Sequence, residues 1–161
     1  MPRNKAFRYG ALLRVRRRQE EIKALALAHV RGEIRRAEDQ RAFVLGEQRR
    51  ILEEAGRAAQ KEFDAADVHR YYQYERHLAR LAVEKDADLA QLRRTEETRR
   101  AELEDAMKRK RIVERLEERY AEALAFEFRR EEQKFTDEVA SNQAARTGGK
   151  RAGPPGLEHH R

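Results

Sequence analysis

The chain has 161 residues, of which 42% are charged and only 7% aromatic, with no tryptophan and no cysteine. The lack of cysteine excludes disulfides and thiolate sites, and the lack of an apolar run of about 18 residues excludes a transmembrane helix. Richness in Ala, Glu, Lys, Leu and Arg is typical of coiled coils, although high charge also occurs in disordered chains. Helical periodicity over residues 12–141 favours the coiled coil.

The net charge of +7 is concentrated at the two ends of the chain. Residues 1–18 contain seven basic residues and no acid, and residues 145–161 carry a net charge of +3. The stretch between them has a net charge of −3 and is therefore close to balanced. A rod that binds nucleic acid more often carries a basic stripe along its length. We therefore expect no nucleic-acid partner, and an acidic partner surface that the ends approach.

The first ten residues are expected to form a flexible basic N-terminus, followed by a first helix that ends near residue 63. Three glycines lower its intrinsic stability, so it needs a packing partner. Upstream, Leu12, Val15 and Ile22 follow a phase displaced by one residue, which predicts a local stutter in the seam. The main apolar positions recur at a spacing of three and four residues: Leu27, Val30, Ile34, Ala37, Val44, Ile51, Ala55, Ala58 and Ala65.

A second helix is expected from about residue 68 to residue 142, and a disordered tail over 143–161. Asp64 and Asp67 can each cap a new helix, which places the turn near 63–68. The predicted fold is thus all-α, an elongated antiparallel two-helix coiled coil over 11–142. The alternative is one uninterrupted helix that dimerises. The second apolar stripe is Tyr71, Tyr74, Leu78, Leu81, Leu89, Leu92, Leu103, Met107, Ile112, Leu116, Tyr120, Leu124, Phe128, Phe135 and Val139.

Three motifs in this pattern resemble the FliJ family of flagellar type III export proteins and the related stalk proteins of injectisomes. In chain order they are Phe7-x-Tyr9-x-x-Leu12-Leu13-x-x-Arg16 with Glu20; Tyr71-x-x-Tyr74 with Leu78 and Leu81; and Arg109-Lys110-x-x-x-Glu114-x-Leu116-x-Glu118-Arg119, running on to Arg130-x-Glu132-Gln133-Lys134-x-x-Asp137-Glu138.

The resemblance implies a non-enzymatic stalk. The five histidines have no ligand spacing that carboxylates or other histidines complete, so no metal and no cofactor are expected. Its expected partners are the hexameric export ATPase, the cytoplasmic domain of the export gate and export chaperones. The expected location is cytoplasmic, peripheral at the inner face of the cell membrane. The alternative function is a structural coiled coil that dimerises through one long helix.

The resemblance also implies two contact regions. Arginine at a rod end suits an acidic ring pore, because guanidinium pairs with carboxylates in bidentate fashion. A solvated end without a dedicated partner is the alternative for both halves of this contact, and for the arginines a nucleic-acid or anionic-membrane contact is a further one. The expected ATPase-ring contacts are Arg14, Arg16, Arg17, Arg18, Arg130, Glu132, Gln133, Lys134, Asp137 and Glu138.

The second contact region lies beside the expected turn. Three tyrosines within four residues cannot all face one narrow seam, so at least one is expected to be exposed, as tyrosines at binding surfaces are. The alternative is that the cluster forms local core at the end of the hairpin. The expected export-gate contacts are Tyr71, Tyr72, Tyr74, Leu78 and Leu81.

Overall fold

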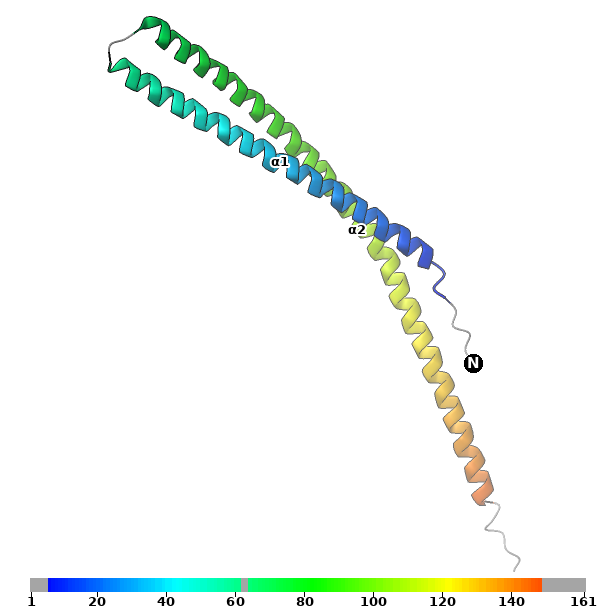
Figure 1. Cartoon of the computed structure of the whole chain (residues 1–161). Helices are drawn as coiled ribbons and strands as arrows, with labels where there is room; N and C mark the ends of the chain where they lie inside the picture. Colours follow the sequence, from blue (N-terminus) through cyan, green and yellow to red (C-terminus); the bar gives the residue numbers. More distant parts are fainter. Residues whose placement is uncertain (1–5, 62–63, 149–161) are drawn as a thin grey trace, which may run out of the picture. The chain divides into compact units, whose positions relative to one another are not determined.

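The computed structural model describes residues 6–61 and 64–148, and these residues form two long α-helices. Helix α1 runs from Gly10 to Ala59 and helix α2 from Ala65 to Gly148 (Figure 1). Proline is absent from both, which permits lengths of 50 and 84 residues, because no backbone hydrogen bond is lost inside either helix. The chain is an all-α helical hairpin, which confirms the predicted fold class.

The turn between the helices falls earlier than the predicted 63–68, because Asp64 is the residue that caps α2. Its Oδ1 accepts a hydrogen bond from the Ala66 N–H at 3.0 Å, which satisfies one of the amides left free at the start of a helix. Asp67 therefore lies inside the first turn, where it forms an ion pair with Arg70.

Both helices extend beyond the predicted coiled-coil bounds of 11–142. Helix α1 begins at Gly10, whose N–H donates to the Phe7 carbonyl at 3.1 Å. Helix α2 continues to Gly148, because the residues from 143 to 147 include neither glycine nor proline. Residues 143–148, expected in the disordered tail, are thus helical. The rest of that tail, 149–161, lies outside the described residues.

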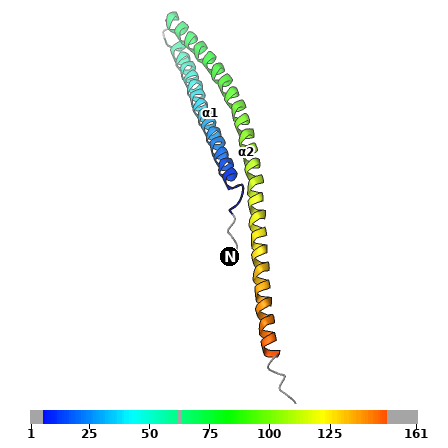
Figure 2. The same ribbon diagram turned by 90° about the vertical axis from the view of Figure 1, so that its right-hand side faces the viewer.

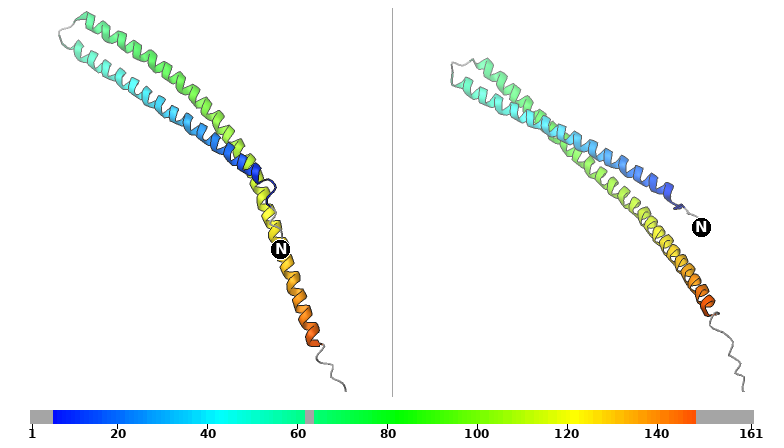
Figure 3. Two further views of the ribbon diagram at one scale, coloured as in Figure 1. Left: turned by 45° about the vertical axis from the view of Figure 1, so that its right-hand side comes forward. Right: turned by 60° about the horizontal axis from the view of Figure 1, so that its bottom comes forward.

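The helices belong to two compact units, residues 12–111 and residues 1–11 with 112–161. In the first unit α1 and the beginning of α2 lie side by side and antiparallel, as Figures 1 and 2 show. Cross-helix ion pairs give the register: Arg31 pairs with Glu96, and Arg41 pairs with Asp86. The further views of Figure 3 show the same pairing from two sides.

The seam of this unit follows a seven-residue repeat, the spacing expected of a left-handed coiled coil. Side chains of α1 and α2 meet in two clusters along it. The first consists of Val30, Ile34, Ala37 and Leu89, with Leu92 packed against it. The second consists of Val44, Ile51 and Leu78, with Tyr71, Leu81 and Ala82 packed against it.

The seam keeps one phase through the start of α1, so the predicted stutter is wrong. Leu12, Val15 and Ile22 are exposed. Leu13 is the buried apolar residue of this stretch, and polar residues occupy two further seam positions: Glu20 forms an ion pair with Lys110, and Lys23 forms one with Glu102 at 3.2 Å. The phase through Leu12, Val15 and Ile22 was wrong, because the seam here runs through Leu13 and through cross-helix ion pairs.

In the second unit the N-terminal segment packs on α2. The Phe7 ring lies 5.7 Å from the Tyr120 ring and 5.8 Å from the Tyr9 ring. Phe7, which lies in the expected flexible N-terminus, thus packs on α2, and residues 1–5 lie outside the described residues. Every residue from 125 to 148 is exposed, including Phe128, Phe135 and Val139 of the predicted stripe.

Candidate partner-binding groove

A groove of about 560 Å³ lies between the two helices within the unit of residues 12–111. Its α1 wall carries Asp39, Phe43 and Glu47. Residues four apart lie on the same face of a helix, so an aromatic ring stands between two carboxylates about 6 Å away along the axis. The Phe43 side chain has little cover, with 69% of its residue surface exposed.

The α2 wall is aromatic and aliphatic. Tyr74 and His77 stack with ring centroids 6.4 Å apart and an interplanar angle of 26°. Leu81 and Lys85 continue this wall, and the Lys85 ammonium donates to the side-chain oxygen of Gln40 at 3.0 Å. The α2 wall therefore offers ring faces, an aliphatic surface and one ammonium group opposite the Asp39 and Glu47 carboxylates.

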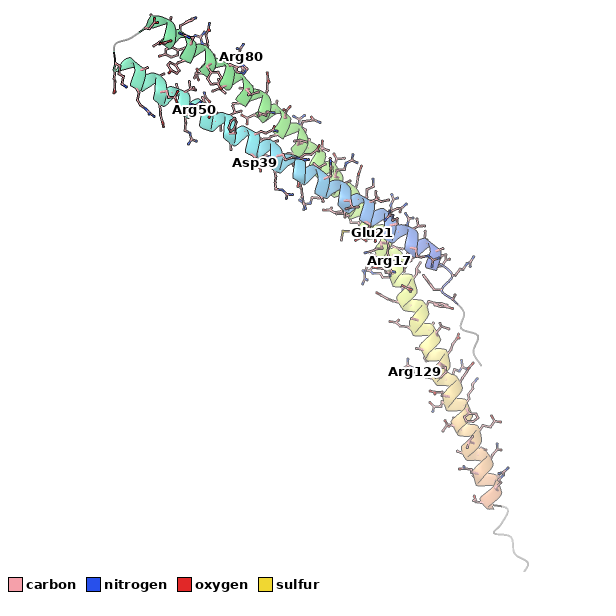
Figure 4. All side chains as sticks on the ribbon, viewed as in Figure 1. Arg17, Glu21, Asp39, Arg50, Arg80 and Arg129 are labelled. Atoms are coloured by element: carbon pink, nitrogen blue, oxygen red, sulfur yellow. The ribbon has the colours of Figure 1, made fainter. Side chains whose placement is uncertain are left out.

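The two carboxylates of the α1 wall differ in their neighbours. Arg50 donates to Glu47 at 3.1 and 2.7 Å, and these hydrogen bonds hold the pKa of that carboxyl below its usual range. Arg50 also donates to Glu54 at 2.8 Å, so the guanidinium that pairs with Glu47 pairs with a second carboxylate as well. Asp39 has no ion-pair partner among the residues the structure describes. The Lys85 ammonium lines the same groove, so the groove holds a cation as well as this carboxylate. Figure 4 labels both Asp39 and Arg50 on α1.

The predicted export-gate residues divide between this groove, the core and the outer surface. Leu78 is a core residue with only 4% of its surface exposed, and Tyr71 packs against the same cluster. Tyr74 and Leu81 line the groove. Tyr72 is 57% exposed, which confirms that the tyrosines cannot all face the seam. The set thus contains both outcomes that were left open, local core and accessible surface.

Sequence reasoning missed Phe43, whose ring is more exposed than that of Tyr74. It precedes Val44, which holds the seam position, so Phe43 itself lies outside the seven-residue repeat. A large aromatic residue off the seam in a chain with few aromatics was the available signal. Its relation to Tyr74 and Leu81 depends on the register between α1 and α2, which the sequence alone did not provide.

The α1 half of the predicted ring contact lies in the unit of residues 12–111. Arg14, Arg17 and Arg18 are exposed, and Figure 4 labels Arg17 near the start of α1. Arg18 forms an ion pair with Glu21 at 3.3 Å. Arg16 is different, because it occupies a half-buried seam position and donates to the Gln19 side chain at 3.0 Å.

The α2 half of the ring contact lies in the other unit, so the two halves have separate packing environments. A shallow hollow there is lined by Phe126 together with basic and polar residues, and Arg129, one of them, is labelled in Figure 4. All six predicted residues of this half are exposed: Arg130, Glu132, Gln133, Lys134, Asp137 and Glu138. They can contact a partner without unfolding the helix.

The described ranges 6–61 and 64–148 also bear on two other classes of site. No group of three or more His, Cys, Asp or Glu side chains there could hold a metal ion. Neither α1 nor α2, over the same ranges, has a stretch long and apolar enough to span a membrane. What the groove and the exposed helix end provide is contact surface.

Comparison with known proteins identifies the family. The family model described as "Flagellar FliJ protein" matches residues 5–149. Curated proteins and solved structures give no match to the chain. The match spans both helices and the turn between them, so it covers the groove and both halves of the predicted ring contact.

Proposed function

The chain belongs to the FliJ family of flagellar proteins, and from this membership we infer that it is a non-enzymatic stalk and chaperone-escort component of the flagellar type III export apparatus. The observation that carries the proposal is the family match over residues 5–149, which coincides with the extent of the hairpin. The family is a non-catalytic component of flagellar export, and the chain has a role related to that export.

The proposed role has two contacts. The arginine-rich start of α1 and the exposed end of α2 bind the ring of the hexameric export ATPase. The closed end of the hairpin, with Tyr72, Tyr74 and Leu81, binds the cytoplasmic domain of the export gate. A protein that holds both partners links the ring to the gate at the inner face of the membrane, and export chaperones bind to the same stalk.

Physical chemistry supports the ring contact in particular. Arg14, Arg17 and Arg18 are exposed cations with a planar, bidentate donor geometry that suits carboxylates lining a pore. The competing function, a dimer through one long helix, requires a helix without interruption. Helix α1 instead ends at Ala59, and a second helix begins after the Asp64 cap and runs back along the first.

The test is ATP hydrolysis by the purified export ATPase of the same organism, with and without this protein, combined with size-exclusion chromatography. We expect co-elution with the assembled ring and faster hydrolysis. An ATPase that assembles normally but neither binds the protein nor changes its rate would refute the ring contact.

Two triple variants give the matched comparison. Replacing Arg14, Arg17 and Arg18 by Glu is expected to abolish co-elution while leaving the helical signal in circular dichroism unchanged. Arg16 is left intact because it lies in the seam. The control replaces Arg35, Arg36 and Arg49, which are also exposed on α1, by Glu. Loss of binding in both variants would mean that only net charge matters.

A further inference from the structure

We propose that the chain binds a second copy of itself, with the start of α1 in one copy packed against the end of α2 in the other. The contact joins a basic face with apolar residues on α1 to an acidic face with apolar residues on α2. It goes beyond the proposed function because it needs no export component, although it uses Arg14, Arg18 and Glu132 of the expected ring contact.

The basic face lies at the start of α1 and consists of Val15, Arg18, Ile22 and Leu25. Residues three, four and seven apart lie on the same side of a helix, so these four side chains share one face. All four are exposed, and the exposed fraction of Leu25 is 69%. The face is separate from the seam, whose buried apolar residue in this stretch is Leu13. Three large apolar side chains are thus left in contact with water.

The acidic face lies at the end of α2 and consists of Phe128, Glu131, Glu132, Phe135 and Val139. Its members also recur at a spacing of three, four and seven residues, so they share one side of the helix. All five are exposed, including 50% of Phe128 and 69% of Phe135. Neither glutamate belongs to an ion pair among the residues that the structure describes. Both carboxylates are therefore available to a cation of a partner.

The basic residues of the same stretch of α2 lie away from the acidic face. The shallow hollow on this stretch is lined by Phe126 together with Arg129, Arg130, Gln133 and Lys134. Successive residues of an α-helix are about 100° apart around its axis, so Phe126 lies about 160–180° from Phe128 and Phe135. The apolar side that carries the two glutamates thus carries none of these three cations.

The two faces are complementary in spacing and in charge. On the basic face a cation lies between two apolar residues seven apart, and on the acidic face two carboxylates lie between two phenylalanines seven apart. When these apolar pairs pack against each other, Arg18 lies opposite Glu131 and Glu132, where a guanidinium can donate to a carboxylate. Arg18 also pairs with Glu21 at 3.3 Å, but both side chains of that pair are exposed, so the guanidinium can reach a further carboxylate.

The exposure of both faces identifies the occupant as a second copy. Each face is exposed in the chain that carries it, so a contact between them requires two chains. Like faces are poor partners for each other, because two acidic or two basic faces bring equal charges together. The contact spans about three helical turns on each copy, less than a permanent dimer buries, so we expect association that depends on concentration.

The experiment is sedimentation velocity of the full-length chain from about 1 µM to about 1 mM, the range in which small contacts bind. We expect the molar mass to rise above the 19.0 kDa of one chain as the concentration increases. Phe128→Ser combined with Phe135→Ser should weaken the association at least about tenfold, as for removal of interface anchors. Phe126→Ser is the matched control, since this phenylalanine is 62% exposed on the other side of α2, and it should leave the association unchanged.

Paired charge reversals make the test specific. One variant combines Arg14→Glu with Arg18→Glu, because Arg14 is exposed and lies four residues before Arg18 on the same edge of the face. The other combines Glu131→Lys with Glu132→Lys. Each variant alone should stay at the mass of one chain, because like charges then oppose the contact. An equimolar mixture of the two should associate again, because the reversed faces complement each other.

Recovery in the mixture cannot come from misfolding, and circular dichroism checks that each variant is folded. Glu122→Lys combined with Asp137→Lys is the control for charge alone, since both exposed residues lie on the other side of α2, and it should not change the association. The proposal is overturned if the wild-type chain keeps the mass of one copy at every concentration, or if the mixture does not associate. It is also overturned if either control weakens association as much as the changes on the two faces.

The outcome is separable from that of the proposed function, because the sedimentation experiment contains no export component. A chain that binds the ATPase ring but does not associate with itself keeps its role in export and loses this contact. A chain that associates through the two faces without binding the ring has the contact and lacks the proposed role at the ring.

Discussion

Substitution of Leu78 by Ala tests whether this residue belongs to the core or to the partner surface. Leu78 is 4% exposed and packs with Val44 and Ile51 across the seam. Truncation of a buried leucine costs about 2–5 kcal/mol, depending on how far the site can collapse. A seam between only two helices relaxes more readily than a globular core, so we expect about 2–3 kcal/mol, at the lower end of that range.

The effect is large enough to read from thermal or urea unfolding followed by circular dichroism. For a unit of about 100 residues, a loss of 1 kcal/mol lowers the melting temperature by about 4–8 °C, so Leu78→Ala should lower it by roughly 10–20 °C. Val83→Ala, on the same helix at an exposed position, is the control and should change stability by less than about 0.5 kcal/mol.

A stability loss for Leu78→Ala no larger than that of Val83→Ala would refute the assignment of Leu78 to the core. If the assignment holds, lost gate binding in a Leu78 variant reports unfolding rather than a missing contact. The exposed Tyr72 is then the informative position among the expected gate residues, because its truncation leaves the seam intact.

Three other changes test the packing and electrostatics of the same hairpin. Gly32→Ala should stabilise it by about 1 kcal/mol in urea unfolding, because a Cβ there meets open space and alanine favours helix; no gain would mean that the helix is distorted at this position. A double-mutant cycle on Arg41 and Asp86, each changed to Ala, should give a coupling of about 0.2–1 kcal/mol that falls in high salt, and zero coupling would mean that this ion pair adds no stability. The pKa of Glu102 is lowered by hydrogen bonds from Arg99 and then Lys23, so its contribution is present above about pH 4.3 and is lost as the pH falls through the lowered pKa. Glu102→Gln should therefore flatten the acid side of the stability curve, and an unchanged curve would rule out this contribution.

The sequence by itself determined that the chain forms long helices, and it favoured a turn near 63–68 over one uninterrupted helix without deciding between them. The absence of proline from position 3 to position 153 and of glycine from 57 to 147 removes the residues that end helices, and Asp64 supplies the cap that starts the second one. The apolar spacing through Val30, Ala37, Val44 and Ile51 likewise identified the main seam, since a seven-residue repeat is a local property of the chain.

Only the tertiary structure decided which side chains of each helix face the other where charges interrupt the repeat. At the start of α1 the seam passes through Glu20 and Lys23, whose partners Lys110 and Glu102 lie far along the chain, and it leaves Val15 exposed. The groove beside Phe43 has the same origin, because its second wall comes from α2. Burial and pairing across two helices depend on their register, and register is set by the sum of cross-helix contacts rather than by either helix alone.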